Sequence, residues 1–350
     1  MATIIENPAD WRAADMEDKG EWVINLSSVQ VAALDRALTT AKASGTTLDA
    51  LTKTNFPLIG FDDLFADVLK RLEQGRGIAV IRGLPALNYT KDDLRMMYWG
   101  IGRHVGVAVS QSSKGDLLGD VMDFGSDVNS STGRGYMSRQ HLGFHTDTSD
   151  VVALMVLRPA MSGGLSMICS SLAIRNEIAR TRPDLLEILY QPFYWSWKGQ
   201  QEPGASPYYQ QPIYSEQDGK FSSRYIKTHI LSAHEDHPEL PKLTDLQHEA
   251  MSAIDHMALD PKFHFSMMFE PGDIQFLNNH VTMHSRSAFQ DYAEPDRRRH
   301  LLRMWLSVPN SRALNPAMAP IYRDQTQGAV RGGFPSRTGS HSFETVQARD

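Results

Sequence analysis

Residues 141–157 have the sequence HLGFHTDTSDVVALMVL. This segment places a histidine, His145, two residues before an acidic residue, Asp147, and then continues into an unbroken apolar run. Side chains two residues apart in a β-strand project to the same face of the sheet. If the segment is a strand, the imidazole and the carboxylate can bind one metal ion together.

A third residue of the same kind lies far downstream, at His284. Two histidines and one carboxylate are the ligands of the facial triad, which holds one face of an octahedral Fe(II) and leaves the other positions open for reaction. We therefore take His145, Asp147 and His284 as candidate metal ligands and as the candidate catalytic centre. The His-x-Asp pattern alone is weak evidence, because short motifs arise by chance and a single histidine is more often structural.

The composition is that of a globular protein. The 350 residues suffice for one large or two ordinary domains, and 41% of them are hydrophobic. The formal net charge is −6, so a nucleic-acid partner is not expected, because such proteins concentrate positive charge. The basic cluster at 297–299 is too short to change this expectation. No apolar run reaches the roughly 18 residues of a membrane span.

Cysteine usage and the first residues bear on the compartment. Cys169 is the single cysteine, which excludes an intrachain disulfide and suits a reducing compartment. It lies in an apolar run and is interpreted as structural. Residues 1–10 have neither the basic start nor the apolar core of a signal peptide. We expect a cytoplasmic protein that acts on a small molecule; the oligomeric state is not readable from the sequence.

Apolar periodicity predicts helices early in the chain and strands in the middle. Helices are expected within 22–51, 61–74 and 90–101, from 171 to 180, from 183, and after a capping box at 244–247. Strands are expected at 77–83, 151–157, 165–170, 263–269, 274–277 and 300–306, with a hairpin over 212–226. Each of the turns at 162–164 and 270–273 is expected to lead straight into a returning strand.

This order of elements favours one domain that is mainly β with flanking helices and has a double-stranded β-helix, or jelly-roll, core. A helical part would cover 1–76, the jelly-roll core 77–309, and an irregular tail 310–350. Residues 111–139 are rich in Gly, Ser and Asp. Such a long polar loop is either a lid over the site or a plain surface excursion.

Two arginines share one face of the strand expected at 300–306. Arg299 and Arg303 are four residues apart, so both side chains can point into the same cavity. A buried, unpaired guanidinium is unfavourable, and a carboxylate ligand held by bidentate hydrogen bonds would remove that penalty. Pairing with Asp or Glu side chains of neighbouring strands is an equally good explanation of these residues.

Four motifs occur in the order found in one enzyme family. They are Gly143-Phe-His145-Thr-Asp147, Gly163-Gly164-Leu-Ser166, Pro271-Gly-Asp273 through Asn279 to His284, and Arg299-His-Leu-Leu-Arg303. Over residues 77–309 the chain thus resembles the taurine dioxygenase and clavaminate synthase-like family of Fe(II)- and 2-oxoglutarate-dependent oxygenases. The resemblance implies that the protein uses Fe(II), 2-oxoglutarate as cosubstrate and O2.

The resemblance also implies roles for the motif residues. The candidate triad would bind the iron. Arg299 and Ser166 would bind the distal carboxylate of 2-oxoglutarate, and Arg303 would contact either the cosubstrate or an anionic group of the substrate. Asp147 is present where related halogenases have a small residue, which favours an oxygenase.

The implied reaction removes hydrogen from a C–H bond of a small, anionic organic substrate. Hydroxylation is the expected outcome, and relatives also catalyse desaturation or cyclisation. His141 and Phe144 are candidate substrate contacts because they lie close to His145 in the sequence. The other histidines at 229, 234 and 237 precede a proline and are interpreted as solvated loop residues.

Two other functions fit parts of the pattern. Catalytic zinc also uses three protein ligands and a water, so the triad could belong to a zinc-dependent hydrolase, but Ser166 and the arginine pair would then have no role. The protein could also be a non-catalytic binding protein with the same barrel. In that case the three candidate metal ligands would have no use.

Overall fold

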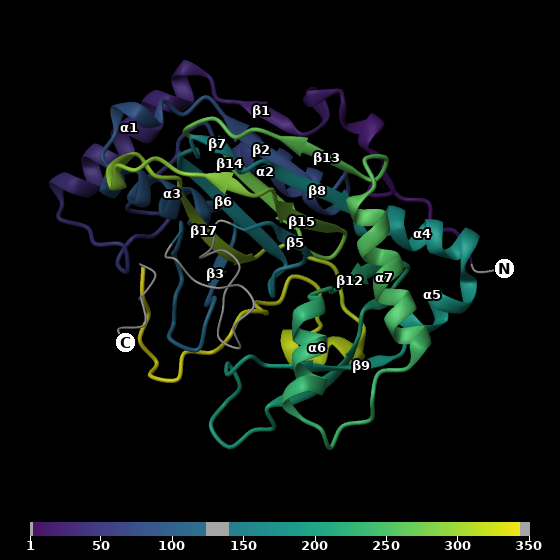
Figure 1. Cartoon of the computed structure of the whole chain (residues 1–350). Coiled ribbons are helices and arrows are strands. Elements are labelled where there is room, and N and C mark those ends of the chain that lie inside the picture. Colours follow the sequence, from purple (N-terminus) through teal and green to yellow (C-terminus); the bar gives the residue numbers. More distant parts are fainter. Residues whose placement is uncertain (1–2, 124–139, 344–350) are drawn as a thin grey trace.

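The computed structural model describes residues 3–123 and 140–343. Two packed β-sheets form its centre, and helices cover their outer faces (Figure 1). The helices are α1 Ser28–Ala43, α2 Asp62–Glu73, α3 Lys91–Val105, α4 Ser171–Thr181, α5 Pro183–Leu189, α6 Lys227–Asp236, α7 Asp245–Leu259 and α8 Ala319–Tyr322. None of the helices in these ranges is long and apolar enough to cross a membrane.

Within the described residues, the strands fall into two main sheets and three short pairs. Their bounds are β1 Val23–Asn25, β2 Ile78–Arg82, β3 Val107–Val109, β4 Gly119–Val121, β5 Leu142–His145, β6 Val151–Arg158, β7 Ser162–Gly163, β8 Ser166–Ser170, β9 Pro192–Ser196, β10 Tyr208–Pro212, β11 Tyr214–Gln217, β12 Lys220–Ser223, β13 His264–Met267, β14 Ile274–Asn278, β15 Thr282–Arg286, β16 Phe289–Gln290 and β17 His300–Ser307. The larger sheet has the order β1-β2-β14-β6-β17-β3, with β4 also paired to β17, and the smaller sheet has the order β13-β8-β15-β5.

Strand β6 shows how the larger sheet is buried on both sides. Val152 and Val156 join an apolar cluster that includes Ile168 of the smaller sheet. Ala153 and Met155, at the alternate positions, pack instead against the helices on the outer face. The unbroken apolar sequence of this strand predicted burial on both faces, and the structure confirms it.

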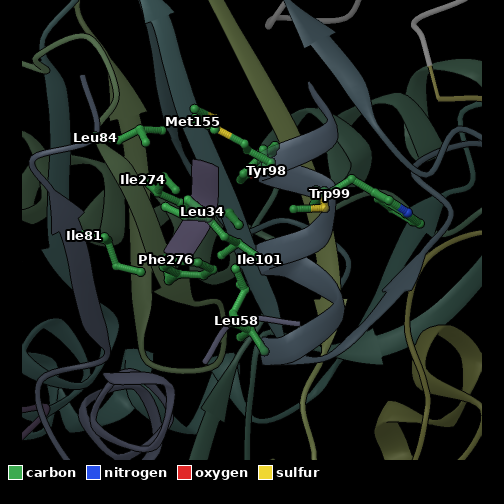
Figure 2. Packing of buried hydrophobic residues seen from close by; sticks show 14 of the residues in the cluster. Leu34, Leu58, Ile81, Leu84, Tyr98, Trp99, Ile101, Met155, Ile274 and Phe276 are labelled. Atoms are coloured by element: carbon green, nitrogen blue, oxygen red, sulfur yellow. The ribbon is translucent and has the colours of Figure 1, made fainter. Parts of the chain in front are cut away.

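Local signals start the helices that cover the larger sheet. Ser27 and Gln30 form a capping box at α1, and Thr90 and Asp93 form another at α3. The apolar sides of these helices meet the sheet around Phe276 of β14 (Figure 2). On the smaller sheet the equivalent layer comes from α4, α5 and α7, and α7 begins at the predicted capping box of residues 244–247.

Two strand partnerships differ from the sequence-based expectation. Strand β8 does not return beside β6 but pairs with β13 and β15 in the other sheet. Strand β14 likewise pairs with β2 and β6, and not with β13. Both turns carry the chain from one sheet to the other. Because the facing sides of the two sheets are both apolar, local alternation does not distinguish a hairpin from such a crossing.

Some predicted elements are displaced or of another type. The helix expected within 22–51 is limited to α1, and β1 precedes it as a parallel partner of β2. The hairpin expected over 212–226 consists of β11 and β12. His229 and His234 are half-buried residues of α6, so the solvated-loop interpretation was wrong for them. Burial lowers the pKa of His229 to about 3.

The loop and tail expectations have mixed outcomes. Residues 111–123 contain the short strand β4, while residues 124–139, on which the lid hypothesis depends, lie outside the described residues. Within 310–343 the backbone is irregular apart from α8 and a short 3-10 helix, as expected. This segment is nevertheless packed, because Leu314, Tyr322 and Phe334 are buried.

Candidate active site

The two histidines of the candidate triad are direct neighbours across two paired strands. His145 ends β5, and its Cα partner in the antiparallel strand β15 is His284. Side chains at paired positions lie on the same face of a sheet, and the two imidazole ring centroids are 4.4 Å apart. Strand pairing alone therefore brings together two residues that are far apart in the sequence.

Asp147 reaches the site in a different way from the one its spacing predicted. Strand β5 ends at His145, so Asp147 lies in the segment that follows the strand. Its backbone N–H donates to the side-chain Oδ1 of Asn279 at 2.9 Å, and the preceding N–H, of Thr146, donates to the carbonyl of Tyr225 at 2.9 Å. His145 and Asp147 do come together as predicted, but the two-residue alternation of a strand is not what brings them together.

The three side chains converge on one small volume. One ligand atom from each of His145, Asp147 and His284 can be chosen so that all lie within 4.8 Å of one another. The Asp147 carboxylate oxygens lie 4.0 Å from Nε2 of His145 and 3.8 Å from Nε2 of His284. The Nδ1 atom of His145 is 2.9 Å from the Gly143 carbonyl, which orients the ring and leaves Nε2 toward Asp147.

Protonation states in the site suit a divalent cation. Burial, the largest effect on Asp147, would raise the pKa of its carboxyl, but the charges of Arg303, His284 and His145 outweigh it and lower that pKa. Burial lowers the pKa of His284 to about 3. Metal ions require an ionised carboxylate and neutral imidazoles. Oδ2 of Asp147 is buried and accepts no hydrogen bond from the described residues, so the donor set fits a metal ion.

A buried network supports the ligand-bearing segments. The Asn279 side chain that accepts from Asp147 also donates to the carbonyl of Ser149 at 3.0 Å. The Asp150 carboxylate is 2.8 Å from Nε2 of His280 and accepts from Nε of Arg331 at 2.8 Å. Sequence reasoning missed these supporting residues, because neither the spacing nor the type of a polar residue shows which distant polar residue it contacts.

A cavity beside the triad is lined by residues of both sheets. Ser166 of β8, His284 of β15 and Leu154 of β6 contribute to it, together with Arg299 and Arg303. The two arginines therefore do point into one cavity, as their spacing predicted. The hydroxyl of Ser166 lies 3.2 Å from the side-chain nitrogen of Gln275.

Arg299 and Arg303 have different surroundings. Nη1 of Arg299 is buried and has no hydrogen-bond partner among the described residues, and burial, followed by the charge of Arg286, lowers the pKa of Arg299 to about 9. Arg303 donates from Nε to the side chain of Gln111 at 2.6 Å, and its Nη1 lies 3.7 Å from Oδ2 of Asp147. The alternative that these arginines pair with acidic side chains thus holds in part for Arg303, which lies near Asp147. It does not hold for Arg299 among the described residues.

Neither of the two candidate substrate contacts is among the residues that line this cavity. Phe144 points to the opposite side of β5 from His145 and is buried in the apolar cluster beneath α4 and α7, with Cys169. His141 is exposed and precedes β5. Strand alternation explains the outcome for Phe144, since neighbouring residues of a strand face opposite sides. Arg286 is a cavity residue that the sequence analysis overlooked, although its place two residues after His284 predicts the same face.

Comparison with known proteins identifies the family. A family model described as "Taurine catabolism dioxygenase TauD, TfdA family" matches residues 41–305. The chain belongs to the TauD, TfdA family. Membership makes this protein a 2-oxoglutarate-dependent dioxygenase that uses Fe(II), 2-oxoglutarate and O2, which confirms the class predicted from the four motifs.

Two curated relatives of this TauD, TfdA family protein match over most of their length. FR-33289 synthase of Streptomyces rubellomurinus is 31% identical over 324 residues, which cover 89% of this chain and 94% of the relative. A taurine hydroxylase-like protein of Stachybotrys chartarum is 28% identical over 317 residues, covering 87% of this chain and 80% of the relative.

Solved structures share the fold at low identity. Asparagine oxygenase in complex with Fe(II), 2S,3S-3-hydroxyasparagine and succinate superposes with a TM-score of 0.61 at 16% identity, covering 81% of this chain and 93% of that chain. The non-haem iron oxygenase OrfP with Fe and alpha-ketoglutaric acid gives a TM-score of 0.59 at 16% identity, with the same coverage of 81% and 93%.

Proposed function

We propose that His145, Asp147 and His284 bind the Fe(II) of this dioxygenase. The observation that carries this proposal is the convergence of the three side chains within 4.8 Å, with a buried carboxylate oxygen that no described residue satisfies. A buried carboxylate oxygen without a hydrogen-bond donor calls for an explanation, and a bound cation between two imidazoles supplies one. The neutral state that burial favours for His284 leaves its ring nitrogen free to coordinate.

The cavity arginines have separate proposed roles. Arg299 would bind the distal carboxylate of 2-oxoglutarate with help from the Ser166 hydroxyl, because its guanidinium is buried without an ion-pair partner among the described residues. Guanidinium and carboxylate match in shape, so a bidentate contact would relieve this burial. Arg303 lies at the metal end of the cavity, beside Asp147, and would contact the cosubstrate or an anionic group of the substrate.

Fe(II), 2-oxoglutarate and O2 together supply the oxidising power that removes hydrogen from a substrate C–H bond, with succinate and CO2 as co-products. The protein's own contribution is to position and shield the reactants. Leu142, Leu154 and Leu301 line the cavity and exclude water from it. Arg303 would hold an anionic substrate close to the metal. Hydroxylation is the proposed outcome.

The ligands and names of similar proteins support a small organic substrate. Asparagine oxygenase has been solved with hydroxyasparagine, and OrfP with (3S)-hydroxy-L-Arg. Among curated relatives, one is described as taurine hydroxylase-like. Family membership and the cationic cavity favour an oxygenase over the two alternatives. A zinc-dependent hydrolase would leave Arg299 without a role, and a non-catalytic barrel would leave the three metal ligands without a use.

The proposal extends to the whole chain. The two sheets would be the jelly-roll core of a single oxygenase domain, supported by their shared apolar cluster and by a cavity lined from both sheets. A cytoplasmic location is supported by the single cysteine, Cys169, which is buried and has no cysteine to pair with. Neither a nucleic acid nor a membrane is part of this proposal.

Succinate release from 2-oxoglutarate tests the metal ligands. Substituting a ligand should affect activity at least as strongly as changes to outer residues around metal sites, which cost about 10–100-fold. We therefore expect Asp147→Ala to lower Fe(II)- and O2-dependent succinate release by about a hundredfold or more. Asp92→Ala, at an exposed position of α3, is the control and should leave the rate unchanged. Equal release by wild type and Asp147→Ala would remove Asp147 from the mechanism.

Substrate class is tested by a panel of carboxylates, sulfonates and amino-acid derivatives. The true substrate should stimulate succinate formation and yield a product heavier by one oxygen. An anionic compound that stimulates the wild type but not Arg303→Gln would support a substrate contact by Arg303. Stimulation by neutral compounds alone would contradict an anionic substrate.

A further inference from the structure

A second buried arginine lies at the same end of the cavity as Arg299. Arg286 is the last residue of β15, and its Cα pairs with Ser166 of β8 on one side and with Leu142 of β5 on the other. Paired positions share a face of the sheet, so Arg286 and Ser166 both project into the cavity that they line. Only 6% of Arg286 and 4% of Arg299 is exposed.

The guanidinium of Arg286 is incompletely satisfied. One nitrogen, Nη2, donates to the backbone carbonyl of Gln140, while the buried Nε has no partner among the described residues. Burial lowers the pKa of Arg286 to about 10, and the charge of Asp123 opposes this only in part. The side chain is thus a buried cation with unused hydrogen-bonding capacity, which is unfavourable unless an anion is bound.

Arg286 and Arg299 both lie against the same aromatic ring, that of Phe289. Their guanidinium carbons lie 4.8 Å and 5.2 Å from the ring centroid of Phe289. Because like charges repel, the charge of Arg286 adds to burial in lowering the pKa of Arg299. An anionic group held between them would remove this repulsion. Arg303 is at the other end, 3.7 Å from the Asp147 carboxylate.

This distribution of charge matches a dianion with a carboxylate at each end. We propose that Arg286 binds the distal carboxylate of 2-oxoglutarate together with Arg299, so that two guanidinium groups and the Ser166 hydroxyl recognise that carboxylate. The inference rests on the proposed function of the cavity. It adds one binding residue, Arg286, whose contribution depends on the presence of the distal carboxylate.

The test compares two cosubstrate analogues that differ only at the distal end. Dissociation constants for 2-oxoglutarate and for 2-oxopentanoate, which has a methyl group in place of the distal carboxylate, are measured by calorimetry on Fe(II)-loaded protein without O2. The variants are Arg286→Gln and Arg286→Lys. Arg297→Gln is the control, because Arg297 is exposed and stacks on Tyr292 outside the cavity.

We expect Arg286→Gln to raise the Kd for 2-oxoglutarate by about 10–100-fold, the usual effect of losing a hydrogen bond between charged groups. The Kd for 2-oxopentanoate should change by less than about threefold, since that ligand lacks the group that Arg286 binds. Arg286→Lys should lie between wild type and Arg286→Gln, because an ammonium keeps the charge but loses the planar contact.

Two outcomes would overturn the inference. An unchanged Kd for 2-oxoglutarate in Arg286→Gln would show that Arg286 serves another purpose, such as an anionic group of the substrate. Equal weakening of both ligands would indicate a general disturbance of the site. Wild-type protein that binds Fe(II) but not 2-oxoglutarate would instead refute the proposed function. If Arg286→Gln fails to fold, the same comparison with Arg286→Lys decides, since it retains the buried charge.

Discussion

Single residues control the geometry of the proposed iron site through backbone contacts as well as through ligation. Asn279 provides the acceptor for the N–H of Asp147 and, from its other side-chain atom, a donor to Ser149. It therefore joins the segment that carries one ligand to the segment that leads into β15 and His284. Loss of a partner of this kind typically lowers metal affinity or activity about 10–100-fold.

Asn279→Ala should weaken metal binding. Without the side-chain acceptor, the Asp147 N–H is buried and unpaired and the carboxylate loses its fixed position, so we expect Fe(II) affinity to fall by about 10–100-fold. Competition with a chromogenic chelator under anaerobic conditions measures this affinity. Asn310→Ala is the matched control, because the Asn310 side chain also donates a hydrogen bond to a backbone carbonyl, that of Leu69 at 2.8 Å. A similar loss of affinity in both variants would assign the effect to general destabilisation.

At the scale of elements, the turn at 270–273 decides where β14 enters the larger sheet. Gly272 has φ +90°, a conformation that L-residues with a Cβ rarely adopt, and a Cβ there would overlap the carbonyl oxygen of Leu84. Asp273 follows and accepts two hydrogen bonds from Arg82 of β2, at 2.8 Å and 2.6 Å. The turn thereby aligns β14 beside β2, and β14 leads directly into the segment that carries Asn279.

Gly272→Ala should destabilise the fold strongly. An alanine at this position would be strained by the positive φ and its Cβ would clash with the Leu84 carbonyl. We therefore expect a loss of about 3 kcal/mol in the free energy of unfolding. Gly219→Ala is the control, because Gly219 has φ +72° in the β11–β12 turn but no atom within 4 Å of the position that a Cβ would take. That variant should lose only about 1 kcal/mol. Urea unfolding of both gives the comparison, and equal losses would show that the close approach is unimportant.

At the scale of the whole molecule, the segment after the family match contributes to the centre of the fold. The match to the TauD, TfdA model ends at residue 305, yet Arg331 is completely buried against Asp150. Arg331 also donates to the carbonyl of Arg312 at 2.6 Å, and the N–H of Gly333 donates to the carbonyl of Thr148 at 2.6 Å. The tail therefore packs directly on the segment that follows Asp147.

Arg331→Ala should destabilise the whole protein. It would leave the buried Asp150 carboxylate with only part of its compensation, and removing one partner of a buried ion pair costs about 3–5 kcal/mol. Arg337→Ala, at an exposed position of the same tail, should cost about 0.5 kcal/mol. Thermal and urea unfolding of both metal-free variants measure the difference. If the two variants unfold alike, the tail is not a stabilising part of this fold.

The sequence by itself determined the chemistry of the site and much of the local structure. Residue types singled out His145, Asp147, His284 and Arg299 as the proposed iron and cosubstrate ligands, because metal and carboxylate binding depend on a few side chains with particular donor atoms. Period and capping identified β6 and the starts of α3 and α7, since these signals act within one or two turns or along one strand.

Only the tertiary structure decided how those parts meet. Pairing of β5 with β15 sets His145 against His284, and Asn279 positions Asp147, in each case across more than a hundred residues of sequence. The meeting of Arg286 and Arg299 around Phe289 also depends on which strands are neighbours. Such contacts are set by the arrangement of the two sheets, which local periodicity does not encode because the alternation is the same whichever strand lies alongside.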